Sequence, residues 1–147
     1  MTVGPLCVRE VDTTFETEPV QVAAQRMHDR KVGTLVVIDE FQRPIGILTD
    51  RDLAIRVVAR GADPFATNVG QAMTRGPRTV LQSSPIESAL GVMRTAACRR
   101  LPVVDDGGKL VGLLSLDDIL DLLAEEFSEI GKLLAEESPG SLRSPTT

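Results

Sequence analysis

The chain has 147 residues, of which 42% are hydrophobic and 25% charged, and it carries a formal net charge of −5. This length and composition are typical of one compact domain or two very small ones. The longest apolar runs, such as 35–38, are far shorter than the roughly 20 residues of a membrane span. Four Phe with no Trp or Tyr provide no stacking platform for single-stranded nucleic acid, so we expect neither membrane nor nucleic acid as a partner.

The N-terminus and the cysteines indicate a cytoplasmic protein without a metal site. The first residues lack the basic start and the apolar stretch of a secretory signal. Two cysteines, Cys7 and Cys98, and a single histidine match no zinc-binding spacing. We therefore expect both cysteines to be free thiols.

An internal repeat organises the chain, because a shift of 66 residues superimposes the sequence on itself without a gap. The identical pairs include Thr13/Thr79, Pro19/Pro85, Ala23/Ala89, Met27/Met93, Leu35/Leu101, Val37/Val103, Asp39/Asp105, Gly46/Gly112, Leu48/Leu114 and Asp52/Asp118. The predicted organisation is repeat 1 over 6–61, a linker over 62–76 with a short helical piece near 69–73, repeat 2 over 69–135, and a disordered Ser/Pro/Thr/Gly-rich tail over 138–147.

The elements of the two copies are predicted to follow one order. They are an extended piece (12–15; 78–81), a helix starting near proline (19; 85), a buried strand (35–38; 101–104), a turn, a second strand (45–48; 111–114) and a last helix after Thr49 or Ser115. In the second copy, Ser84 and Glu87 predict a capping box. About 60 residues bury too little surface to be secure alone. We therefore predict an α/β (α+β) fold in which two pseudo-symmetric repeats, each a small sheet with flanking helices, pack through their sheets about an approximate two-fold axis.

One motif occurs in both copies, as Gly46-Ile47-Leu48-Thr49-Asp50-Arg51-Asp52 and Gly112-Leu113-Leu114-Ser115-Leu116-Asp117-Asp118. A hydroxyl followed three residues later by an acid is typical of a capping box. The same groups suit a ligand, because the Asp can accept hydrogen bonds from a ribose diol and the helix N-terminus suits a phosphate. The strand glycine would let a flat ring approach the backbone. Capping and ligand binding are compatible.

The repeat, its element order and this motif closely resemble a tandem pair of cystathionine β-synthase (CBS) domains, often called a Bateman module. The stretches that carry the resemblance, besides the motif, are Val32-Gly33-Thr34-Leu35-Val36-Val37-Ile38-Asp39 and Arg99-Arg100-Leu101-Pro102-Val103-Val104-Asp105. The resemblance covers about residues 6–135, and the chain looks like a stand-alone pair.

The resemblance implies a regulatory, non-catalytic module that binds AMP, ADP, ATP or S-adenosylmethionine in two clefts between the repeats. The first cleft would combine Thr49, Arg51 and Asp52 with Thr79, Val80, Arg99 and Arg100. The second would combine Ser115 and Asp118 with Thr13, Thr14, Val32 and Gly33. Asp52 and Asp118 would hold ribose hydroxyls, Thr49 and Ser115 would lie near phosphate or ribose, and Val80 and Val32 would flank adenine. Since Asp117 adds negative charge to the second motif, we expect a phosphate to bind first in the cleft with the arginines.

The last helix, 117 to about 136, carries an apolar residue at alternating steps of four and three: Leu116, Leu120, Leu123, Phe127, Ile130 and Leu134. Core packing explains its first half, whereas the second half extends past the matched repeat and suits self-association or a partner. We expect a homodimer through the helices that start at Pro19 and Pro85, whose small residues Ala23, Ala24 and Ala89 permit close contact.

Two other function classes are weighed against the regulatory reading. The alternative is a ligand-free dimeric adaptor or structural module that binds an unidentified protein target through the acidic last helix. An enzyme is disfavoured, because the sequence shows no nucleophile–base set, metal cluster or Gly-rich phosphate loop.

Overall fold

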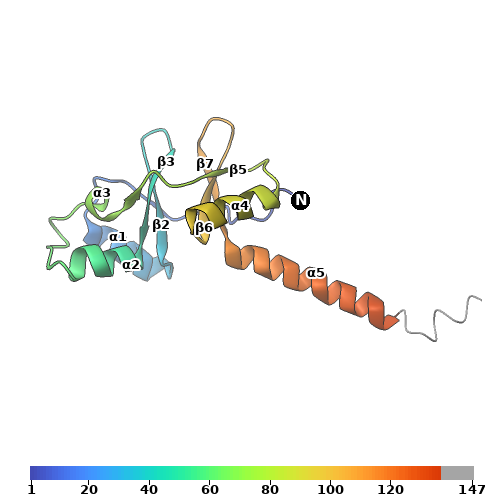
Figure 1. Ribbon diagram of the computed structural model, residues 1–147. Helices are drawn as coiled ribbons and strands as arrows, with labels where there is room; N and C mark the ends of the chain where they lie inside the picture. The colour runs from blue at the N-terminus through green and yellow to red at the C-terminus, as the bar shows by residue number, and fades with distance from the viewer. Residues whose placement is uncertain (137–147) are drawn as a thin grey trace, which may run out of the picture.

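The computed structural model describes residues 1–136, and the tail predicted to be disordered (138–147) lies outside the described residues. Two small sheets lie side by side, and the hairpins at their centres carry their turns at the same end of the molecule (Figure 1). The elements of the first half are β1 (Thr13–Thr14), α1 (Val20–Arg30), β2 (Thr34–Ile38), β3 (Pro44–Thr49), α2 (Asp50–Leu53), the π-helical turn η1 (Ala54–Val58), α3 (Val69–Ala72) and β4 (Thr74–Arg75). Those of the second half are β5 (Val80–Leu81), α4 (Ile86–Ala96), β6 (Arg100–Val104), β7 (Leu110–Ser115) and α5 (Leu116–Glu136).

The strand pairing repeats with the offset seen in the sequence. β1 runs parallel to β2 and β2 antiparallel to β3, with Thr34 opposite Thr49; β5, β6 and β7 pair in the same way, with Arg100 opposite Ser115. A register shift falls at equivalent places, after Val37 and after Val103. The predicted pair of related folds is therefore confirmed, and the two hairpins also share a register shift that was not predicted.

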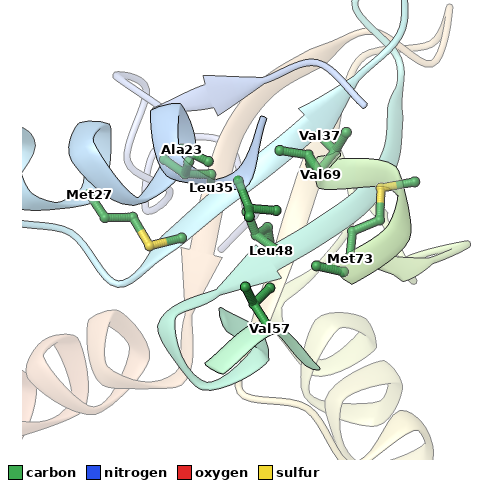
Figure 2. Packing of buried hydrophobic residues seen from close by; sticks show 10 residues of the cluster. Ala23, Met27, Leu35, Val37, Leu48, Val57, Val69 and Met73 are labelled. Carbon is green, nitrogen blue, oxygen red and sulfur yellow. The ribbon is translucent and has the colours of Figure 1, made fainter. Parts of the chain in front are cut away.

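Each repeat has its own apolar core between its sheet and its helices. In the first repeat, alternate β2 side chains face α1, because successive strand residues point to opposite faces, and the β3 and α3 side chains complete the cluster (Figure 2). The equivalent cluster of the second repeat gathers around Leu101, Val103 and Leu114. Val36 and Pro102 lie on the face of their sheet that points away from the repeat's own core, and both are also buried. This is consistent with two sheets that cover each other.

Each repeat is preceded along the chain by a lead-in segment that packs on the other repeat: residues 3–8 precede the first repeat and residues 69–75 precede the second. The segment α3–β4 lies in the predicted linker, yet it pairs with β3 and places Val69 and Met73 in the first core. Residues 3–8 do the same for the second repeat: Val3 is fully buried, and Val8 forms a two-residue bridge with Leu113. Two separate segments of the chain therefore connect the repeats by packing. The sequence predicted only a linker between them.

Two helix predictions are wrong in detail. Pro85 is the N-cap residue of α4 and makes no side-chain cap, so the expected capping box of Ser84 and Glu87 does not form. Ala23 and Ala89 are fully buried in their own cores, because the small side chains let each helix lie close to its own sheet. They are not available for contact between copies, whereas Ala24 is exposed, so the small-residue rationale for a dimer is corrected for Ala23 and Ala89 and remains a prediction for Ala24.

Candidate functional site

The two motifs build the same capped helix start. The Thr49 hydroxyl accepts from the Asp52 N–H (3.1 Å), and the Asp52 carboxylate accepts from the Thr49 N–H (2.9 Å). In the second copy Ser115 and Asp118 exchange equivalent bonds of 3.1 and 3.3 Å. The capping interpretation is therefore confirmed for both copies. In each copy the carboxylate oxygen that accepts the capping hydrogen bond is Oδ2. The Oδ1 atom takes no part in the cap.

A cleft of about 350 Å³ lies against the second motif and is lined from both repeats. The second repeat contributes Ser115 and Asp118, and the first contributes Val32 and Gly33. The volume falls in the range of small-molecule pockets. The cleft lies where β2 of one repeat begins and α5 of the other begins, so a ligand there would touch both halves of the chain.

Charges of both signs line this cleft. Lys31 and Arg100 bring positive charge, and Glu10, Asp12 and Asp118 bring negative charge. Asp12 is already engaged, since Arg30 Nε lies 2.8 Å from its carboxylate. The cleft therefore offers cationic donors to an anionic part of a ligand and carboxylate acceptors to the hydroxyl groups of a neutral part.

The structure brings together Val32, Gly33, Ser115 and Asp118, four residues expected to share a cleft. Thr14 is buried and donates to Glu18 Oε1 (3.0 Å). Thr13 lines a neighbouring hollow with Arg26 and Arg30. The two threonines thus hold β1 in place. The residues just before them, Glu10 to Asp12, line the cleft.

The residues expected around the first motif are less concentrated. Thr49 and Asp52 are half-buried, and Arg51 and Thr79 are exposed. Val80, expected to flank adenine, is 6% exposed and packs in the core of the second repeat. Its side chain therefore supports the sheet.

Arg99 and Arg100 lie beside the second motif, a neighbourhood that the sequence analysis did not assign to them. Arg100 is opposite Ser115 and lines the cleft of Asp118. Arg99 Nη2 lies 3.4 Å from Asp117 Oδ1, and the Arg99 carbonyl accepts from the Leu116 N–H. The cause is the antiparallel pairing of β6 and β7, which places the start of β6 at the start of α5. The acidic charge of Asp117 is thereby partly compensated.

Gly46 and Gly112 serve packing within the protein, so the interpretation that they admit a flat ring is corrected. A Cβ on Gly46 would collide with the Met73 side chain, and a Cβ on Gly112 would come within 2.9 Å of the Val8 carbonyl oxygen. These neighbours belong to the two lead-in segments. The strand glycines therefore let each segment lie flat against the hairpin of the other repeat.

Sequence reasoning missed Glu10, Asp12 and Lys31 as lining residues. Lys31 follows α1 in a left-handed conformation (φ 56°) and so turns the chain toward the cleft. Its position directly before Val32, a residue already assigned to the site, was the available signal.

Two negative findings hold for residues 1–136. No group of three or more His, Cys, Asp or Glu side chains there could hold a metal ion. Within the same residues, no helix combines the length and the apolar character that crossing a membrane requires.

Comparison with known proteins gives a family match over most of the chain. A family model for the CBS domain matches twice, at residues 3–59 and 69–125. MK0525 of Methanopyrus kandleri is 36% identical over 122 residues, which are 83% of this chain and 62% of that protein. The chain also covers 25% of the longer CBS domain-containing protein CBSCBSPB1 of Arabidopsis thaliana. The chain thus spans less than two thirds of both relatives.

Hypoxic response protein 1 of Mycobacterium tuberculosis is 33% identical over 85% of this chain and 82% of that protein. A crystal structure of hypoxic response protein I with two coordinated zinc ions has a TM-score of 0.74 at 30% identity, over 82% of this chain and 98% of that chain. The CBS domain protein PAE2072 of Pyrobaculum aerophilum, complexed with AMP, has a TM-score of 0.72 at 28% identity, over 80% and 89% of the two chains. The chain therefore belongs to the CBS domain family and carries two CBS domains in tandem.

Proposed function

We propose that this chain is a non-catalytic regulatory module that binds an adenosine ligand between its two CBS domains. The observation that carries the proposal is the cleft of about 350 Å³ in which the capped start of α5 meets Val32 and Gly33 of the other repeat. A ligand in that position contacts both halves, so its binding energy would favour one relative arrangement of them.

The lining groups suit the three parts of a nucleotide. Asp118 would accept ribose hydroxyls on its Oδ1 edge while Oδ2 keeps the cap. Val32 offers an apolar wall for adenine, and Lys31 and Arg100 offer donors for phosphate. The AMP complex of PAE2072 supports an adenosine ligand in a related pair of domains.

The charges favour AMP among the adenosine phosphates. Two cations face two acids besides the ribose-binding Asp118, and Arg30 already engages one of those acids, Asp12. Each further phosphate would add negative charge close to Glu10. ADP, ATP and S-adenosylmethionine remain members of the test panel, with weaker binding expected for the longer phosphate chains.

The order of filling follows from the arginines. With Arg99 and Arg100 beside the second motif, we expect AMP to bind first in the Asp118 cleft and more weakly near Asp52. This reverses the order expected from the sequence, in which both arginines were assigned to the first motif.

Calorimetric titration of AMP tests the function. Asp118→Asn retains an amide oxygen for the cap but loses the charge, and we expect it to weaken the tighter site by about tenfold, a loss of about 1.4 kcal/mol. Asp52→Asn is the matched control, because it makes the same change in the equivalent cap and should leave the tighter site within about twofold. Loss of that site in Asp52→Asn alone would reverse the assignment. No binding of any panel member by the natural chain at millimolar concentration contradicts the function and favours the ligand-free adaptor.

We also propose that the module acts as a homodimer in the cytoplasm and signals to a protein target. The observation that supports association is the amount of apolar side chain on helix surfaces, including Val58 (76% exposed) and Phe127 (69% exposed). Exposed apolar area of this kind marks contact surfaces in proteins that remain in solution.

A further inference from the structure

Helix α5 carries an apolar stripe that the rest of the described chain leaves uncovered. We define the α5 stripe as Leu120, Leu123, Phe127, Ile130 and Leu134, whose side chains are 45% to 69% exposed. Figure 1 shows α5 projecting away from both sheets. The first turns are different, because Ile119 is 2% exposed and Leu116 packs against the second core.

The spacing of the stripe is that of a paired helix. Its steps of three, four, three and four residues repeat every seven residues, which keeps the side chains on one seam of two helices that wind around each other. A helix that extends from a domain without packing is marginally stable in water, because most helix stability comes from burying an apolar face. We therefore expect the α5 stripe to be buried against another protein surface.

The charges that border the seam indicate which kind of protein surface can cover the stripe. The acidic side chains of α5 beyond the first turn lie mostly on its outer faces: Asp121, Glu125, Glu129 and Glu136. The positions that border the stripe are Ala124 and Gly131 on one side and Glu126 and Leu133 on the other. An acidic seam would call for a basic partner, but this seam is flanked by one acid and three small or apolar residues.

A second copy of α5 fits this arrangement when the two helices run parallel. In a parallel pair the residue before one seam position faces the residue after the next seam position of the other helix. Glu126 then faces Gly131 of the second copy. No two acids oppose each other, and the small residues let the helices approach closely.

We infer that the α5 stripe is covered by the same stripe of a second copy of this chain, in a parallel two-helix contact. The inference rests on the self-association in the proposed function and assigns it a surface. It places the two bodies at the same end of the helix pair, with the cleft of Asp118 next to the point where each helix enters the pair.

Sedimentation of the full chain tests the contact with a matched pair of variants. At tens of micromolar, the natural chain should sediment at twice its 15.8 kDa mass. Ile130→Glu puts a carboxylate in the seam and should return the chain to the monomer mass. Ser128→Glu adds the same charge two residues earlier, on a face away from the stripe, and should stay dimeric. Leu134→Gln is a second seam variant, and it lies beyond the segment that matches the CBS domain, so folding of the two repeats does not depend on it.

The outcomes separate this inference from the ligand proposal. Monomeric natural chain overturns the contact and the self-association while leaving AMP titration as an independent readout. A dimer that survives both Ile130→Glu and Leu134→Gln overturns the α5 contact alone. Dissociation by Ser128→Glu to the same extent as by Ile130→Glu assigns the effect to total charge and overturns the seam.

Discussion

Glu18 and Arg26 fasten β1 to α1 in the first repeat. Arg26 Nη2 lies 2.9 Å from Glu18 Oε2, and Arg26 Nη1 donates to the Thr13 carbonyl at 2.9 Å. The hydrogen bond from Arg26 is the main cause that lowers the pKa of Glu18 below its ordinary value. The equivalent positions of the second repeat are Ser84 and Val92, so only the first repeat depends on this pair.

Glu18→Gln should lower the free energy of unfolding at neutral pH by about 1–2 kcal/mol, because it removes a charged partner from a half-buried arginine. Since the folded state lowers the pKa of Glu18, the ionised group stabilises the fold above its unfolded pKa, and this contribution is lost as the pH falls through the folded pKa. Urea denaturation at neutral and acidic pH should therefore show the two curves converging in acid. Glu16→Gln is the control, because its contact with Arg75 is 3.3 Å long between exposed side chains and should change stability little. A difference that persists unchanged in acid would contradict the assignment to the charge.

At the scale of the element, the hairpin of each repeat depends on a glycine that accepts a crossing segment. Gly112→Ala should destabilise the protein by about 1–3 kcal/mol, since the added methyl group meets the Val8 backbone and the Cys7 side chain. Gly91→Ala, in α4, is a matched control: its Cβ would meet nothing within 4 Å, and removing a helix glycine should stabilise by about 0.5–1 kcal/mol. Thermal unfolding of both variants measures the contrast. Equal effects of the two changes would show that Gly112 does not hold the segment.

The sequence predicts elements well where the pattern of apolar residues is local. The short continuous apolar runs 35–38 and 101–104 predict β2 and β6, because such runs are typical of strands that are buried on both faces. The neighbourhood of Arg99 and Arg100 with Ser115 and Asp117 was missed for a different reason. Which motif they approach is set by the register of β6 on β7, and register depends on pairing between segments that are distant along the chain. The capping boxes, which are local, were predicted from the same motif correctly.

At the scale of the whole molecule, the crossing segments make the two repeats interdependent. The Val3 N–H donates to the Ser84 carbonyl (2.9 Å), and the Leu110 N–H donates to the Gln42 carbonyl (2.9 Å) across the two hairpin turns. The first residues of the chain thus belong to the last core. No local pattern in residues 1–9 indicates this, because the partner surface lies about 80–110 residues away along the chain.

This interdependence predicts a single unfolding transition. Val3→Ala removes two methyl groups from a fully buried site of the second core and should cost about 1–3 kcal/mol. If the repeats unfold together, the loss lowers the midpoint of the whole protein, and probes in either repeat report the same curve. Hydrogen exchange followed on β2 of the first repeat and β6 of the second provides the two probes. An effect confined to β6, with β2 protected as in the natural chain, would show that the repeats are independent units and that the N-terminal crossing stabilises only the second.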